Sequence, residues 1–126
     1  MAKTLCKIAG IVLFIVGLVG FAMPGLLGMH LTSIHNIVHL LTGAIALYFG
    51  FSGSAAAART FCLVFGAVYL LLGILGFVAP GVVAGIIGHT LAAGESLTAD
   101  NAVHLLLGAV FLAVGAGKAT PAAAAV

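Results

Sequence analysis

Histidine is the residue type with the widest chemistry in this 126-residue chain, and two of its five histidines lie four residues apart. His35 and His39 would share one helix face, at the spacing found in helical metal sites. Asp100 and His104 have the same spacing later in the chain. If the two helices meet, the four side chains form a site of three histidines and one carboxylate, which suits zinc or another divalent metal.

The same residues allow two other interpretations. His39 and His104 alone, at equal depth on facing helices, could ligate a haem or a chlorin-type pigment. Alternatively, these histidines, together with Asn36 and Asn101, hydrogen-bond neighbouring helices or loops and hold the protein together without any ligand. The sequence leaves all three interpretations open, so the identity of a cofactor is unknown.

The remaining polar residues offer less chemistry. His30 and His89 are expected in loops near the lipid headgroups, with no ligand role, and Cys6 and Cys62 are expected to be reduced thiols. The sequence contains no phosphate-binding glycine loop, no nucleophile elbow, no carboxylate pair at catalytic spacing and no basic patch for nucleic acid. We therefore expect a protein that is not an enzyme.

The composition indicates that the histidine-bearing elements are membrane helices. Hydrophobic residues make up 64% of the chain and charged residues 5%, which is too little polar surface for a soluble domain of this size. Crossing a hydrocarbon core of about 30 Å takes roughly 17 to 25 apolar residues. Four stretches meet this requirement, at residues 8–27, 34–51, 61–79 and 99–116.

The few basic residues predict the orientation. Lys3 and Lys7 precede the first stretch, Arg59 lies between the second and third, and Lys118 follows the fourth. Basic residues near membrane ends are retained in the cytoplasm, so both termini are expected there, in a multi-pass protein of the cell inner membrane. Both acidic residues and all five histidines then lie at or near the outer end.

A duplication organises the chain into one membrane domain, residues 1–126. The first hairpin, residues 3–53, resembles the second, residues 59–118, and residues 119–126 form an Ala-rich tail that is expected to be disordered. The alignment pairs Cys6, Gly17, Gly20, Phe21, Asn36 and His39 with Cys62, Gly73, Gly76, Phe77, Asn101 and His104. Both copies cross twice and share one orientation. The predicted fold is an all-α integral membrane four-helix bundle of two tandem, parallel-repeat hairpins.

Helix ends are marked by residues with special backbone properties. Pro24 and Pro80 are expected to close the first and third helices, and Ser33 and Thr98 are expected to be the N-caps of the others. Residues 82–94 are apolar and glycine-rich but too short to span the membrane, which predicts an interfacial or partly re-entrant segment.

Glycines recur every seven residues along each predicted helix. They are Gly10 and Gly17, Gly43 and Gly50, Gly66 and Gly73, and Gly108 and Gly115. In lipid, small residues allow close backbone approach and so drive helix packing. Because His39 and His104 lie on the same stripes, their side chains are expected to point into the bundle.

Short motifs shared by the two hairpins resemble those of a bacterial four-helix membrane family, known as domain of unknown function 4383. The residues that carry the resemblance are Gly20, Phe21, Asn36, His39, Gly43, Gly73, Gly76, Asn101, His104 and Gly108. It extends from about residue 8 to residue 115. The resemblance implies a compact bundle in a bacterial inner membrane, and it assigns no ligand to the histidines.

Two functions follow as competing expectations. The first is a structural or accessory subunit that associates with itself or with a larger membrane complex, since glycine lies on every helix without chemistry beside it. The alternative is a module that binds haem, a chlorin pigment or a divalent metal through the histidines. A small-solute channel ranks third, because no polar path continues inward from Asn36 and Asn101 beyond the glycines.

Overall fold

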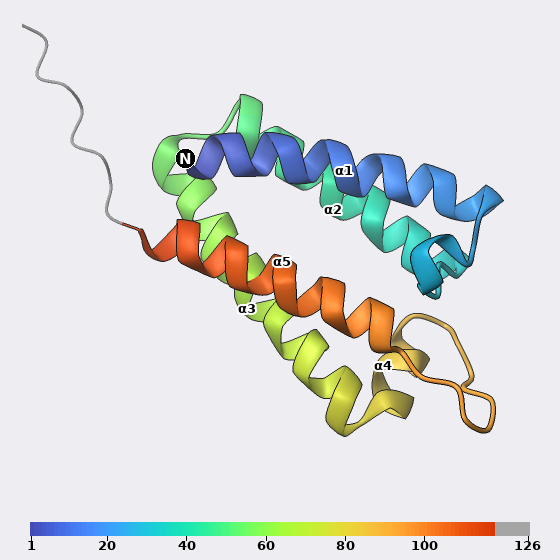
Figure 1. Ribbon diagram of the computed structural model, residues 1–126. Helices are drawn as coiled ribbons and strands as arrows, with labels where there is room; N and C mark the ends of the chain where they lie inside the picture. The colour runs from blue at the N-terminus through green and yellow to red at the C-terminus, as the bar shows by residue number, and fades with distance from the viewer. Residues whose placement is uncertain (118–126) are drawn as a thin grey trace, which may run out of the picture.

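The structure, a computed structural model, describes residues 1–117, and this part of the chain is helical with no strand (Figure 1). Four long helices are α1 (Ala2–Ala22), α2 (Ser33–Phe51), α3 (Ala55–Val78) and α5 (Thr98–Ala116), and the short elements are the 3-10 helix η1 (Leu26–Gly28) and α4 (Pro80–Ile86). Lys118 and the predicted tail lie outside the described residues.

Each long helix has the length and composition of a membrane span. Their 19 to 24 residues rise roughly 29 to 36 Å at 1.5 Å per residue, enough for the hydrocarbon core. Only 33% to 39% of each apolar window is buried inside the bundle, which leaves most of it to face lipid. The predicted all-helical membrane fold with four spans is therefore confirmed.

Glycines bring the backbones of each hairpin into contact. α1 packs along α2, and α3 packs along α5. A Cβ atom added to Gly43 would lie 2.8 Å from the backbone nitrogen of Phe14, and one on Gly108 would lie 2.5 Å from that of Leu70. Real Cβ atoms do not approach backbone so closely, so any larger residue there would push the paired helices apart.

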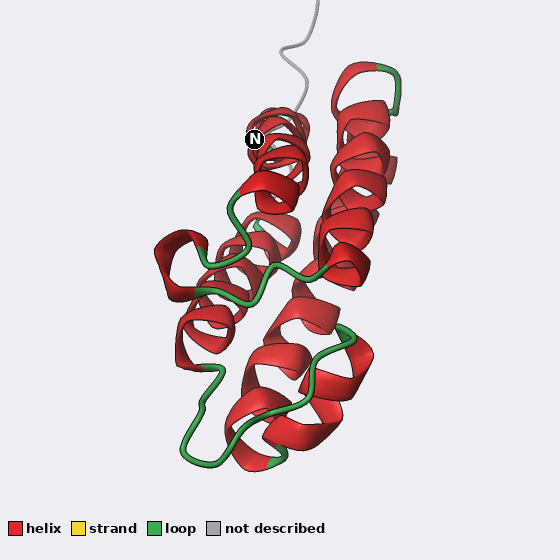
Figure 2. Cartoon of the chain, turned by 90° about the vertical axis from the view of Figure 1, so that its right-hand side faces the viewer, coloured by secondary structure: helices red, strands yellow, loops and turns green. Residues whose placement is uncertain are grey.

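The two hairpins meet along a thinner interface, in which α3 contacts α1 and α2, and α1 contacts α5. At the end that holds the chain N-terminus, the buried core includes Cys6, Cys62 and Phe61, with Phe111 from α5. The two sulfur atoms are 3.8 Å apart. We call this the cysteine end; the opposite end, where α2 and α5 begin, is the histidine end. Figure 2 views the molecule from the histidine end, where loops cross in front of the helices.

Two of the four predicted helices have wrong boundaries. The first helix covers Ala2–Ala22 instead of 8–27, because Pro24 interrupts the hydrogen-bond ladder and Leu27 has a left-handed backbone with φ of 54°. The third begins at Ala55 instead of residue 61, because the Ser54 hydroxyl accepts the Ala57 amide and an alanine run favours the added turns. The even spans begin within one residue of the prediction.

The predicted N-caps are also corrected. The cap of α2 is Thr32, whose hydroxyl accepts the backbone N–H of His35 at 3.1 Å and donates to the carbonyl of Ile87. The residue before α5 is Leu97, which provides no side-chain cap. At α2, the adjacent Thr32 and Ser33 share the same capping chemistry, so the sequence could not decide which of them precedes the first helical residue.

The segment predicted at 82–94 begins as part of a short helix. Pro80 opens α4, where its missing N–H is harmless, and Val83 and Ala84 pack with Ile87 and Leu97 in a small buried cluster. Residues after α4 form the loop that leads to α5. This packing holds the loop against the end of α3, and it thereby positions the polar residues described next.

Candidate functional site

All five histidines and both acidic residues of the chain gather at the histidine end. They are His30, His35, His39, His89, His104, Glu95 and Asp100. They come from the loop before α2, the loop between α4 and α5, and the first two turns of α2 and α5. We call the whole set the histidine cluster.

Asp100 is the buried centre of this cluster. Its side chain is 0% exposed, and its carboxylate accepts the backbone N–H of His30 at 3.0 and 3.2 Å and the Nδ1 of the same residue at 2.8 Å. His35 lies beside it, with Nδ1 3.9 Å from the carboxylate and 2.8 Å from the carbonyl of His30. The first turn of α5 also favours a negative charge, because the helix dipole is positive there.

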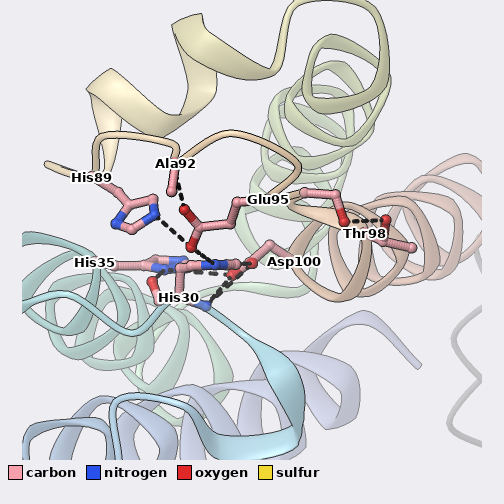
Figure 3. A network of polar contacts seen from close by, with 8 residues as sticks. His30, His35, His89, Ala92, Glu95, Thr98 and Asp100 are labelled. Carbon is pink, nitrogen blue, oxygen red and sulfur yellow. Dashed lines mark hydrogen bonds and ion pairs between the residues drawn. The ribbon is translucent and has the colours of Figure 1, made fainter.

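Glu95 forms the outer layer of the cluster (Figure 3). One carboxylate oxygen, Oε1, lies 2.9 Å from Nε2 of His30 and 3.0 Å from Nε2 of His89. The other, Oε2, accepts the backbone N–H of Ala92 at 2.7 Å. The hydrogen bond from Ala92 and the contacts with both histidines lower the pKa of Glu95 below its usual value.

His30 connects the buried Asp100 to the outer Glu95. Its ring lies between Asp100 and Glu95, with one nitrogen directed to each carboxylate. Partial burial opposes protonation of His30, but hydrogen bonds with Asp100 and Glu95 and their negative charges outweigh burial and raise its pKa. The outer cluster is thus arranged to hold positive charge between two carboxylates.

The inner layer contains imidazoles with unused capacity. The His35 ring centroid is 4.3 Å from that of His39 and 5.9 Å from that of His104, and Tyr69 lies 5.2 Å from His104. Nδ1 of His39 and of His104 is buried and has no hydrogen-bond partner among the described residues. Since buried polar atoms are normally paired, these two nitrogens are available to a ligand or to water.

Two cavities flank this inner layer. One, of about 140 Å³, opens between α2, α3 and α4, and the other, of about 200 Å³, opens between α1, α3 and α5. His35, His39, Tyr69 and His104 line both, and the other lining residues are mostly apolar. Pockets for drug-sized ligands measure about 300–1,000 Å³, so each cavity suits a smaller guest.

The two asparagines of the even helices pack against glycines of the odd helices. Asn36 donates from Nδ2 to the carbonyl of Leu31 at 3.1 Å, and a Cβ on Gly20 would lie 2.0 Å from its Oδ1. Asn101 has the same relation to Gly76, at 1.7 Å. These amides therefore occupy the space where the side chain of a larger residue would be.

The structure brings the four predicted ligands His35, His39, Asp100 and His104 to one place, although Asp100 is turned toward His30. Among the described residues, the group with three metal-ligating atoms within 4.8 Å of one another is a different one: His30, His89 and Glu95. Sequence reasoning placed His30 and His89 in loops without a ligand role. One feature of the sequence could have indicated that His30 and His89 meet: in a four-span bundle, the loops that carry them must lie at the same end.

Comparison with known proteins identifies the family but no activity. A family model described as "Domain of unknown function (DUF4383)" matches residues 3–117. No curated protein and no solved structure matches the chain. The resemblance found in the sequence motifs is thereby confirmed over nearly the full described length.

Proposed function

The chain belongs to the DUF4383 family, whose function is unknown, and from this premise we propose that it is a structural or accessory subunit of a membrane assembly. The observation that carries the proposal is backbone contact at glycine in both hairpins, including Gly43 against Phe14 and Gly108 against Leu70. Such contacts make each hairpin a stiff unit. Stiffness without a reaction centre suits a protein that positions other components.

The middle of the bundle supports the same proposal. Toward the middle of the bundle, apolar side chains fill the space between the helices. The ring centroid of Phe65 in α3 lies 5.8 Å from that of Phe111 in α5, and Phe111 and Ala46 of α2 are fully buried. Ions and polar solutes need polar groups along their path. A packed apolar centre therefore favours a scaffold over a channel.

We further propose that the histidine end faces outward and that both termini lie in the cytoplasm of a bacterial inner membrane. Lys3, Lys7 and Arg59 all belong to the cysteine end, as the positive-inside rule requires for a cytoplasmic face. Arg59 donates from its guanidinium to the carbonyl of Gly115 at 3.2 and 3.3 Å, which satisfies the end of α5. The similar Gly–Asn contacts of the two hairpins support a duplicated unit.

An assembly experiment tests the accessory role. The protein is extracted from its native membrane in mild detergent, and the mass of the protein part is measured by light scattering and mass spectrometry. We expect a defined species larger than the 12.5 kDa chain, containing further copies or a stoichiometric partner. A homogeneous monomer in native lipid would contradict the proposal.

Exposed positions provide matched variants for this experiment. Ile15, Leu41, Leu71 and Leu106 lie on the four long helices with 54%, 61%, 57% and 66% exposure. Replacing each by tryptophan leaves the interior packing intact. The larger species should therefore disappear only in the variants whose substituted helix contacts a partner. If all four variants keep it unchanged, the assembly does not use these lipid-facing surfaces and a contact through the end loops must be tested.

A second candidate function is a ligand-binding module centred on His39 and His104. The specific observation in its favour is that the Nδ1 atoms of these two histidines lie beside two cavities and have no hydrogen-bond partner within residues 1–117. Because these cavities measure about 140 and 200 Å³, a metal ion or another small ligand fits them and a haem or chlorin does not. Protein purified gently from native membrane would then contain stoichiometric metal that is lost in both His39→Ala and His104→Ala, and it would show no Soret or chlorin absorption band. A clean spectrum without metal, with variants that lose only thermal stability, would leave the histidines as interhelical contacts.

A further inference from the structure

The outer layer of the histidine cluster has the chemistry of a metal site that is separate from the inner histidines. Its three side chains come from two loops: His30 precedes α2, while His89 and Glu95 follow α4. The ring centroids of His30 and His89 are 4.7 Å apart, and both Nε2 atoms lie against the same oxygen of Glu95 (Figure 3). These side chains are between 17% and 28% exposed, so an ion could enter from solvent.

The positions of the hydrogens on His30 show that its contact with Glu95 needs a proton or a metal ion. The carboxylate of Asp100 can only accept, so Nδ1 of His30 carries the hydrogen of that 2.8 Å contact. In a neutral imidazole, Nε2 of His30 is then a lone pair, and it faces an oxygen of Glu95 that also carries lone pairs. A proton, carried by the ring or by the carboxyl group, or a metal ion must therefore lie between the two atoms.

The atoms that face away from the common point are already fixed. Asp100, fully buried, holds Nδ1 of His30, and the amide of Ala92 holds Oε2 of Glu95. Metal-bound histidines characteristically donate their other ring N–H to a carboxylate, which sets the tautomer and orients the ring. His30 therefore has the outer partner of a metal ligand before any metal is bound.

Distances and donor types indicate the class of ion. Two imidazole nitrogens and one carboxylate oxygen suit zinc and related divalent transition metals, with further positions left for water. Ligands at about 2.0–2.1 Å around a tetrahedral zinc lie about 3.3 Å apart. The contacts of 2.9 and 3.0 Å must open by only a few tenths of an ångström, which flexible loop side chains can provide.

We propose that Nε2 of His30, Nε2 of His89 and a carboxylate oxygen of Glu95 bind one divalent transition-metal ion, with Asp100 as the outer-sphere partner of His30. The ion would join a loop of the first hairpin to a loop of the second. It would thus tie the hairpins together where the interface between them is thin.

Zinc titration of the full-length protein tests this site. The chain is prepared without a polyhistidine tag, placed in lipid nanodiscs, stripped with EDTA and titrated with ZnCl2 in a calorimeter; CoCl2 provides ligand-field absorption bands as a direct readout of coordination. We expect one ion per chain. His89→Ala and Glu95→Gln should abolish saturable binding, and Asp100→Asn should weaken it by about 10- to 100-fold.

Ser96 provides a matched control in the loop that carries His89 and Glu95. Its hydroxyl is exposed and contacts Thr98 but none of the proposed ligands, so the zinc affinity of Ser96→Ala should equal that of the wild type. His39→Ala is titrated beside it, to separate this site from the inner histidines. Helical circular dichroism checks the fold of every variant, and Glu95→Gln, which preserves the shape of the side chain, decides the outcome if His89→Ala is misfolded.

Three results would overturn the proposal. The first is a folded wild-type protein that binds neither zinc nor cobalt at neutral pH. The second is unchanged binding in both His89→Ala and Glu95→Gln. The third is binding lost in His39→Ala but kept in His89→Ala, which would place the metal at the inner histidines.

Discussion

The two ends of the bundle join the same pair of hairpins by opposite chemistry. At the cysteine end, Cys6 and Cys62 are both 0% exposed and pack with small and aromatic side chains. At the histidine end, the buried Asp100 is held by hydrogen bonds from a loop of the other hairpin. Apolar contact tolerates small changes of shape, whereas a buried charge must keep its partners. The histidine end should therefore be the more sensitive of the two.

The largest expected effect is removal of the buried carboxylate. Asp100→Ala leaves the backbone N–H and ring of His30 without an acceptor, and we expect the free energy of unfolding to fall by about 3–5 kcal/mol. Unfolding of nanodisc-embedded protein by steric trapping measures this change. A loss below about 1 kcal/mol would show that the buried carboxylate does not hold the hairpins together.

An intermediate effect is expected where asparagine rests on glycine. Gly76→Ala places a Cβ 1.7 Å from the Oδ1 of Asn101, so the amide must move, and overpacking of this kind costs about 1–3 kcal/mol. Gly81→Ala is the matched control, because its Cβ would meet nothing within 4 Å. Equal stabilities of the two variants, measured by the same unfolding method, would contradict the tight contact.

At the cysteine end, a smaller change is expected. Cys62→Ala removes one buried sulfur atom from an apolar site, and we expect a loss of about 1 kcal/mol. Cys62→Ser should cost more, because its hydroxyl replaces a sulfur that packs 3.8 Å from Cys6. If serine is tolerated better than alanine, this end is more polar than its contacts suggest, and the contrast between the ends weakens.

The smallest effect is a pH dependence of the metal-free protein. The raised pKa of His30 stabilises the folded state below the ordinary histidine value of 6.5, and this contribution is lost as pH rises through the raised pKa. Glu95, with its lowered pKa, acts oppositely: its contribution is lost as pH falls below 4.5 through that lowered pKa. The other titratable groups around His30 are Asp100 and Glu95, which contact its ring nitrogens, His89, whose ring lies beside it, and His35, which contacts its carbonyl oxygen.

Melting temperatures of EDTA-treated protein across this range should therefore be highest between the two pKa values. Glu95→Gln should reduce the loss on the alkaline side, because it removes one of the two carboxylates that hold the proton on His30. A wild-type profile that rises steadily from acid to alkaline pH would contradict the proposed charge balance.

The sequence predicted the even helices better than the odd ones. α2 and α5 begin within one residue of the expected positions, because the hydroxyl residues Ser33 and Thr98 mark where each helix begins. α1 was placed too late because apolar residues continue past Pro24, where hydropathy and helix geometry disagree. α3 was placed too late because its predicted span started after the charged Arg59, whereas the alanine run before Arg59 has high helix propensity.

Helix periodicity allowed the helical residues of the site to be predicted from the sequence, but the loop residues could not be predicted in this way. The spacing of His35 and His39 implied a common face, since a helix repeats every 3.6 residues. No such rule connects His30 to Glu95, whose approach depends on the turn at Leu27 and on how α4 packs against α3. Contacts between two loops arise from the fold as a whole, so the outer layer of the cluster became visible only in three dimensions.

The burial of both native cysteines has a practical consequence for topology. Cys6 and Cys62 are the only thiols in the chain, and neither side chain reaches the surface. Water-soluble maleimides added to intact cells should leave them unlabelled. The native cysteines therefore need not be removed before a reporter cysteine is introduced. A single cysteine introduced at Ala93 in the long loop, or at Ser54 between α2 and α3, would then report directly which end of the protein faces the medium.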